Sequence, residues 1–125
     1  SVTEIGEWAF YNCTSLENIT IPESVTKIGE GAFQNCTSLE SIAIPKGVTK
    51  IVIGTFKGCT SLTAVTLPAG VKNIENALFH ECSALSTIYV PAKKTDYYKD
   101  RLPEELHDTI VELVPEKKAK ASPRT

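Results

Sequence analysis

The sequence has little net charge, no long apolar run and no methionine, and each shortage excludes a property. Thirteen Lys and Arg residues against fifteen Asp and Glu residues give a net charge of -2, so the chain lacks the positive surplus that nucleic-acid binding requires. Its longest apolar runs, such as Ile51–Ile53, fall far short of the roughly 20 residues of a membrane-spanning helix. Because the chain starts at Ser1 and contains no Met, we expect it to begin after a processing site or inside a longer protein, with any secretory signal removed upstream.

Motifs for catalysis and for metal binding are also missing from the sequence. It contains no Gly-x-Ser-x-Gly turn, no glycine-rich phosphate loop and no paired histidine ligands, and His80 and His107 are isolated. The four cysteines are spaced 23 residues apart, which is not the Cys-x-x-Cys spacing of a zinc site. We therefore expect no enzymatic activity, no cofactor and no bound metal.

The chain does contain a repeat with a period of 23 residues. Its 125 residues, 42% hydrophobic and 22% charged, suit one folded domain. The columns of identical residues are Phe10, Phe33, Phe56, Phe79; Cys13, Cys36, Cys59, Cys82; Pro22, Pro45, Pro68, Pro91; Leu16, Leu39, Leu62, Leu85; Val2, Val25, Val48, Val71; and Ile5, Ile28, Ile51, Ile74. Four units, Ser1–Glu23, Ser24–Lys46, Gly47–Ala69 and Gly70–Ala92, therefore make up residues 1–92.

Each unit predicts one short strand and one tight turn. The segment Leu16–Pro22 alternates apolar and polar residues with a period of two, which predicts a strand that Pro22 ends. The spacing of Val25, Ile28, Phe33 and Cys36 favours a helical or 3-10 turn. One strand and one turn cannot bury their own apolar faces, so successive units are expected to stack with their strands parallel, as a repeat solenoid.

The repeat resembles the BspA-like leucine-rich repeats of bacterial surface proteins, treponemal ones among them, and of protist surface proteins. The segments that carry the resemblance are Ile28–Leu39 and Ile42–Pro45, and the likeness extends over residues 1 to about 114. It implies a right-handed leucine-rich-repeat coil with parallel β-strands on the concave side, short helical or 3-10 turns on the other side, and a C-terminal cap. It also implies a protein-protein interaction module of a cell-surface, secreted or periplasmic bacterial protein, engaged in adhesion or contact with a host matrix or receptor protein.

The two ends of the repeat array differ. Residues 93–114 are expected to form a capping segment whose apolar run Thr109–Val114 adds a final strand, and residues 115–125 are expected to be a disordered basic tail. The first unit has no comparable cap. We therefore expect earlier repeats or another subunit to cover it, which leaves open a homo-oligomer that assembles through the N-terminal coil.

The cysteine column is expected to consist of four buried free thiols that act as small apolar fillers. Neighbouring cysteines in stacked units are close enough for a disulfide, but their side chains run parallel, which disfavours the bridge geometry. Three triplets that begin at Asn12, Asn18 and Asn35 match the N-glycosylation pattern, which matters only in a eukaryotic secretory protein.

The candidate binding residues are of two kinds. Two solvent-facing columns of the concave face hold small uncharged residues and one tyrosine, namely Asn18, Ser41, Ala64, Thr87 and Thr20, Ala43, Thr66, Tyr89. The second kind breaks the repeat without being required by stacking, namely Trp8, Tyr11, Val52 and Ile53. Ordinary drift with local packing is the alternative explanation of the second set.

Two functions therefore remain open. The first is a protein-interaction module whose aromatic exceptions, Tyr89 above all, anchor a partner. The second is a structural spacer or self-assembly element that dimerises through the uncapped N-terminal coil. Carbohydrate recognition has weaker support, because the concave columns lack the aromatic platforms on which a sugar would stack.

Overall fold

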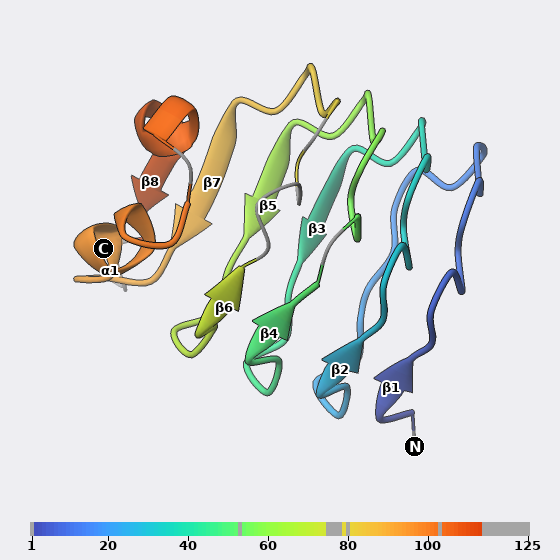
Figure 1. Cartoon of the computed structure of the whole chain (residues 1–125), viewed down its shortest axis with the longest axis horizontal. Coiled ribbons are helices and arrows are strands. Elements are labelled where there is room, and N and C mark those ends of the chain that lie inside the picture. Colours follow the sequence, from blue (N-terminus) through green and yellow to red (C-terminus); the bar gives the residue numbers. More distant parts are fainter. Residues whose placement is uncertain (1, 53, 75–78, 80, 103, 114–125) are drawn as a thin grey trace, which may run out of the picture.

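The chain winds into a parallel-strand solenoid of about four turns whose coils stack along the long axis of the molecule (Figure 1). The computed structural model describes residues 2–52, 54–74, 79, 81–102 and 104–113. We number the coils 1 to 4 after the 23-residue units of the sequence. The leucine-rich-repeat fold expected from the repeat is therefore confirmed.

One sheet is built from the strands predicted for coils 2 to 4 and for the C-terminal segment. Its strands are β3 (Ser41–Ala43), β5 (Ala64–Thr66), β7 (Thr87–Val90) and β8 (Ile110–Glu112). They are parallel and lie in that order, and an isolated bridge from Asn18 to Ser41 extends the pairing to coil 1. Ser41 is aligned with Ala64, which is aligned with Thr87, so equivalent residues of successive units stand side by side. We call the solvent-facing side of this sheet the strand face.

The other side of each coil also contains a short strand, where the sequence favoured a helical or 3-10 turn. β1 (Glu4–Ile5) pairs in parallel with β2 (Lys27–Ile28), and β4 (Lys50–Ile51) pairs in parallel with β6 (Asn73–Ile74). Within the described residues, helix is confined to the C-terminal segment, in α1 (Thr95–Lys99) and the 3-10 helix η1 (Glu104–Thr109). The prediction of helical or 3-10 turns in the repeats was therefore wrong.

The backbone after each of these strands explains the difference. The amides of Trp8 and Phe10 donate to carbonyls of coil 2, at Glu30 (2.9 Å) and Ala32 (2.8 Å). The amides that alternate with these donate three residues back, from Ala9 to Gly6 (3.2 Å) and from Tyr11 to Trp8 (3.1 Å). Alternate amides thus bond outside the coil, which no helix can do. Residues of positive φ, which a 3-10 helix does not use, recur in this segment at Trp8, Asn12, Gly31, Asn35, Gly54, Gly58 and Glu81.

The core is a stack of identical side chains along the solenoid axis. Phe33 and Phe56 are fully buried, and the Phe column is stacked ring on ring, with centroids 5.2 Å apart from Phe10 to Phe33, 5.7 Å from Phe33 to Phe56 and 6.0 Å from Phe56 to Phe79. Because each ring covers the next, the apolar faces that one unit cannot bury alone are buried between neighbouring units.

The cysteines form a second stack, and all four are free. Each thiol after the first donates to the carbonyl of the Phe one coil back: Cys36 to Phe10 and Cys59 to Phe33 at 3.1 Å, and Cys82 to Phe56 at 3.0 Å. Cys36 and Cys59 are buried, but Cys13 and Cys82 are only partly buried. The expectation of four buried thiols was wrong for these two, since coils 1 and 4 have a repeat neighbour on one side only.

The segment after coil 4 covers the end of the stack (Figure 1). Helix α1 places the buried Tyr98 over the core, and β8 pairs with β7 inside the range where the sequence predicted a final strand. The tail predicted for residues 115–125 lies outside the described residues. In the part of the chain that the structure describes, we find no helix long and apolar enough to cross a membrane.

Candidate functional site

A shallow hollow lies on the strand face and unites most of the candidate residues of the two columns. Its volume is 480 Å³, and its lining consists of Asn18, Ile19, Thr20, Ser41, Ile42, Ala43, Ala64, Thr66 and Tyr89. The strands place these residues together because alternate residues of a strand face the same side and equivalent residues of neighbouring coils are in register. Thr87, aligned with Ala64, is the one column residue outside the lining.

The chemistry of this hollow is uncharged. Its polar groups are hydroxyls and one amide, its other side chains are small or aliphatic, and Tyr89 supplies the aromatic ring at the coil 4 end. The coil 1 and coil 2 residues Asn18, Thr20, Ser41 and Ala43 are exposed, whereas Tyr89 is half-buried. Such a surface can form hydrogen bonds and close van der Waals contacts with a partner.

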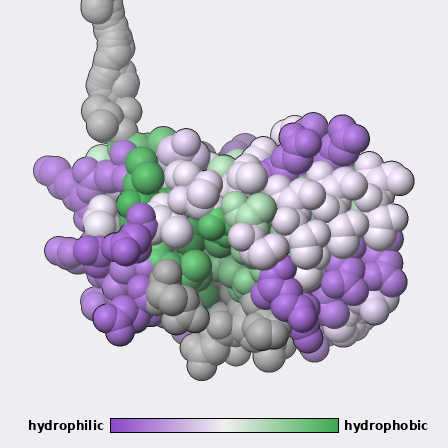
Figure 2. Space-filling view, turned by 90° about the horizontal axis from the view of Figure 1, so that it is seen from above, coloured by the Kyte–Doolittle hydropathy of each residue, from purple (hydrophilic) through white to green (hydrophobic). Residues whose placement is uncertain are grey.

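The edge of the coils above this sheet is less uniform. Figure 2 shows near-neutral residues over part of the array, a hydrophobic band beside them, and strongly hydrophilic residues towards the two ends of the long axis.

The irregular residues of the sequence do not form one site. Trp8 is 45% exposed and Tyr11 is 44% exposed, and their rings meet edge to face at 5.3 Å. Trp8 covers Gly31 of coil 2: a Cβ atom at Gly31 would lie 2.1 Å from the Trp8 ring. Val52 is half-buried and lines a different groove. Ile53 lies outside the described residues.

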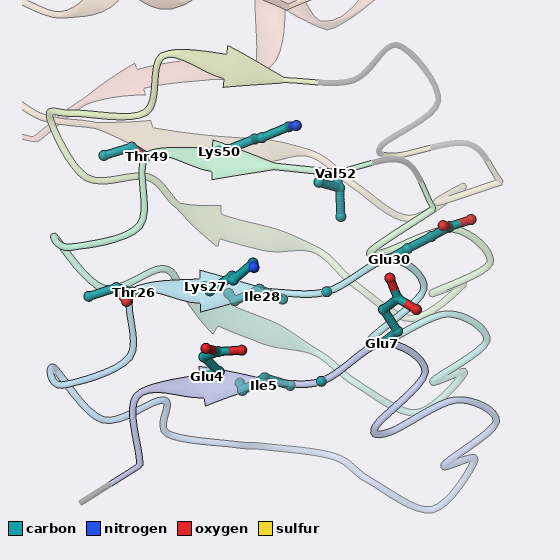
Figure 3. Close-up of a pocket in the computed structure, with 12 residues that line it drawn as sticks. Glu4, Ile5, Glu7, Thr26, Lys27, Ile28, Glu30, Thr49, Lys50 and Val52 are labelled. Carbon is teal, nitrogen blue, oxygen red and sulfur yellow. The ribbon is translucent and has the colours of Figure 1, made fainter.

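That groove is a large surface feature that the sequence did not predict. It has a volume of 710 Å³, lies over β1, β2 and β4, and is lined by Glu4, Ile5, Gly6, Glu7, Thr26, Lys27, Ile28, Gly29, Glu30, Thr49, Lys50 and Val52. In Figure 3 the side chains of Glu4, Lys27 and Lys50 stand on the strands, and those of Glu7 and Glu30 lie beyond the strand ends. The sequence contains two pairs of like charges one period apart, Lys27 with Lys50 and Glu7 with Glu30. These pairs were the signal that could have predicted the groove. We call this surface the charged groove.

The buried nucleophiles of the protein are held in their unreactive form. Burial raises the pKa of the Cys59 thiol to about 12, and it raises the pKa values of Cys36 and Cys82 to about 11. A thiol attacks an electrophile or binds a metal as its thiolate, so the cysteine column is suited to packing and not to chemistry.

His107 lies 3.0 Å from the carbonyl of Leu102 in the C-terminal segment. No cluster of His, Cys, Asp and Glu residues in the described part of the chain could hold a metal ion.

Comparison with known proteins agrees with this architecture. The chain is similar to solved structures of a leucine-rich cell surface protein from Faecalibacterium prausnitzii A2-165, with 30% identity and a TM-score of 0.73 over 92% of this chain, and of a leucine-rich repeat protein from Bacteroides ovatus, with 33% identity and a TM-score of 0.72 over 90%. A leucine-rich repeat protein from Eubacterium ventriosum matches 66% of the chain at 33% identity, with a TM-score of 0.63.

The chain spans less than a third of each of these structures, namely 31%, 28% and 23% of their lengths. No curated protein is significantly similar to it. The family model for a BspA type leucine rich repeat region, in six copies, matches residues 1–101. The protein therefore belongs to the BspA type leucine-rich repeat family.

Proposed function

We propose that the chain is a protein-interaction module that binds its partner in the hollow of the strand face, and that it serves adhesion or contact with host proteins as part of a bacterial cell-surface or secreted protein. The observation that carries this proposal is the hollow itself, in which four units combine their outward columns into one uncharged surface with Tyr89 at its coil 4 end. The description of the Faecalibacterium relative as a cell surface protein supports the location.

The lining also indicates the kind of contact. Small side chains let a partner approach the sheet closely, and a tyrosine beside them provides a rigid ring that retains a polar tip. Interface energy concentrates in a few such aromatic anchors while the surrounding small residues exclude water. A protein surface with an apolar side chain against Tyr89 and hydrogen-bonding groups over Thr20 and Ser41 fits this arrangement.

The experiment measures binding of the purified chain to immobilised, purified extracellular-matrix proteins, each tested separately by surface plasmon resonance. Saturable binding to at least one of them is expected. Tyr89→Ala should weaken that binding at least about fivefold, the loss expected of an interface anchor. Ala43→Arg, which places a long charged side chain in the hollow, should weaken it further.

Tyr11→Ala is the matched control, because it removes an exposed tyrosine from the turn side of coil 1. It should leave the affinity unchanged. Equal affinity of Tyr89→Ala, Ala43→Arg and the unmodified chain for a bound matrix protein would contradict binding through the strand face. Absence of any saturable matrix binding would contradict the adhesive role.

A second function is favoured by one observation, the exposed apolar residues of coil 1. Val2 is 55% exposed, and Trp8 and Tyr11 lie on the same coil. A spacer or self-assembly element would dimerise through this coil. Sedimentation equilibrium then gives a concentration-dependent dimer that Trp8→Ala weakens, whereas a monomer at all concentrations contradicts this function.

A further inference from the structure

The charged groove is built from two pairs of like charges that the fold does not require. β2 and β4 lie in adjacent coils (Figure 3), so Lys27 and Lys50, one period apart, occupy the same column, although the two strands belong to different sheets. The amide of Trp8 donates to the carbonyl of Glu30, which places Glu7 beside Glu30 in the neighbouring column. Like charges in one column repel, and stacking tolerates other residues there: in the lysine column Glu4 is aligned with Lys27, and Asn73 is aligned with Lys50.

Two glycines lie between the lysine pair and the glutamate pair. Gly6 is exposed, and a Cβ atom placed on it would have no neighbour within 4 Å. A Cβ atom on Gly29 would lie 2.6 Å from the backbone nitrogen of Glu7, so coil 1 and coil 2 approach too closely for a side chain at Gly29. Between the two pairs, a ligand therefore meets no side chain at Gly6 or Gly29 that it would have to displace.

We propose that the charged groove binds an extended polypeptide segment that carries one acidic and one basic side chain two residues apart. The acidic side chain faces Lys27 and Lys50, and the basic side chain faces Glu7 and Glu30. Successive side chains of an extended chain point to opposite sides, so residues two apart, about 7 Å along the chain, face the same side. Both charged side chains of such a segment can therefore face the groove, which Lys27 and Glu30 line together.

The charges of the groove disfavour the simpler occupants. A polyanion such as nucleic acid is repelled by Glu7 and Glu30 at one wall and by Glu4 at the end of the other wall. A polycation is repelled by Lys27 and Lys50. A segment with both charges satisfies both walls, and it binds independently of the strand face, so this proposal does not rest on the adhesive function.

The test titrates the isotopically labelled full chain with short acetylated and amidated peptides, followed by the NMR shifts of the Gly6 and Gly29 amides. The mixed-charge peptide has Asp at its second position, Arg at its fourth and Ser at the other four. It should shift the NMR signals of both amides until the groove is saturated. Its affinity should fall at high salt, because salt screens exposed ion pairs. The peptide with two Asp residues and the peptide with two Arg residues should each bind at least about fivefold more weakly.

Charge-reversal variants distinguish binding in the charged groove from nonspecific electrostatic attraction. Lys50→Glu should weaken the mixed-charge peptide at least about fivefold, whereas Lys46→Glu, at an exposed lysine that does not line the groove, should leave its affinity unchanged. Lys27→Glu combined with Lys50→Glu makes both walls acidic, and this variant should prefer the peptide with two Arg residues. That reversal of preference cannot arise from misfolding.

Three outcomes would overturn the proposal. They are saturable binding of the two-Asp peptide as tight as that of the mixed peptide, equal loss with Lys46→Glu and Lys50→Glu, and no saturable shift of Gly6 and Gly29 with the mixed peptide. Tyr89→Ala, tested in parallel, should not change this binding, so failure here leaves the strand-face function standing and the reverse also holds.

Discussion

At the scale of single residues, the cysteine column combines packing with hydrogen bonding. The thiols of Cys36, Cys59 and Cys82 each donate to a Phe carbonyl in the preceding coil, so a polar group of the inner backbone is satisfied by a small side chain. An alanine at the same place would fill less space and donate nothing. The cysteine column therefore makes these hydrogen bonds only while its thiols are protonated.

This requirement predicts a loss of stability at alkaline pH. Burial raises the pKa of Cys59 from 9.0 to about 12, and burial raises that of Tyr98 from 10.0 to about 12. The folded state holds these protons more tightly than the unfolded state, so their stabilisation is complete below about pH 9 and is lost as the pH rises towards 12. Urea midpoints should therefore fall between pH 8.5 and about pH 11, and Cys59→Ala should reduce the fall. A midpoint independent of pH over this range would contradict the buried column.

The phenylalanine column predicts a large effect of one truncation. Phe33 is fully buried between Phe10 and Phe56, so Phe33→Ala should lower the free energy of unfolding by about 3 to 5 kcal/mol. Denaturant titration measures this loss. Phe10→Ala serves as the comparison, since Phe10 is only partly buried and should lose less. A loss of less than about 1 kcal/mol for Phe33→Ala is incompatible with a buried ring.

At the scale of elements, the C-terminal segment replaces the backbone donors that a further coil would supply. Inside the array the carbonyl of Thr3 accepts from the amide of Thr26, and that of Thr49 accepts from Lys72, both at 2.8 Å. The carbonyl of Lys72 accepts instead from the guanidinium Nε of Arg101 at 3.2 Å.

Two tyrosines add to this side-chain cap. The Tyr97 hydroxyl donates to Val71 at 2.8 Å, and the Tyr98 hydroxyl donates to Pro68. Arg101 also stacks 3.6 Å from the centre of the Tyr97 ring. These contacts bind α1 to the coils that it covers.

Tyr98→Phe tests this cap. The change keeps the buried ring and leaves the carbonyl of Pro68 without its donor, so the free energy of unfolding should fall by about 1 to 2 kcal/mol. Denaturant titration measures the fall, with Tyr11→Phe, at an exposed ring, as the neutral control. If both variants unfold at the same denaturant concentration, the hydroxyl contact does not stabilise the cap.

The sequence predicted those elements whose hydrophobic pattern is set by residues close together within one unit. The Ile-x-Ile alternation before Pro45 and the Val-x-Leu alternation before Pro68 predicted the strands, and the same alternation predicted which columns face solvent. The turns were misjudged because Val25 and Ile28, like Phe33 and Cys36, are three residues apart as on one face of a helix, while the decisive hydrogen bonds run to the neighbouring coil. The charged groove was missed for a related reason: its walls exist only after coils stack, and one unit alone shows an ordinary mixture of charges.

At the scale of the whole molecule, each coil contacts only its neighbours, and stability should vary along the array. Two equivalent amides allow a matched comparison: Phe10 donates to coil 2 at 2.8 Å, and Phe33 donates to coil 3 at 2.9 Å. Hydrogen exchange under native conditions should be faster for Phe10, because coil 1 has a repeat neighbour on one side. Equal exchange rates would show that the described coils unfold only as a single unit.

The same stacking determines how the molecule would respond to mechanical force. β1 and β8 lie at opposite ends of the long axis (Figure 1), so a pull between them runs along the line on which the coils are stacked. Hydrogen bonds between coils would then be loaded one row at a time, and coils would peel off in sequence. Each 23-residue coil would release about 75 Å of chain in exchange for a coil spacing of about 5 Å. A tether of this kind lengthens in regular steps under load, and each step dissipates work before the attachment at either end is strained.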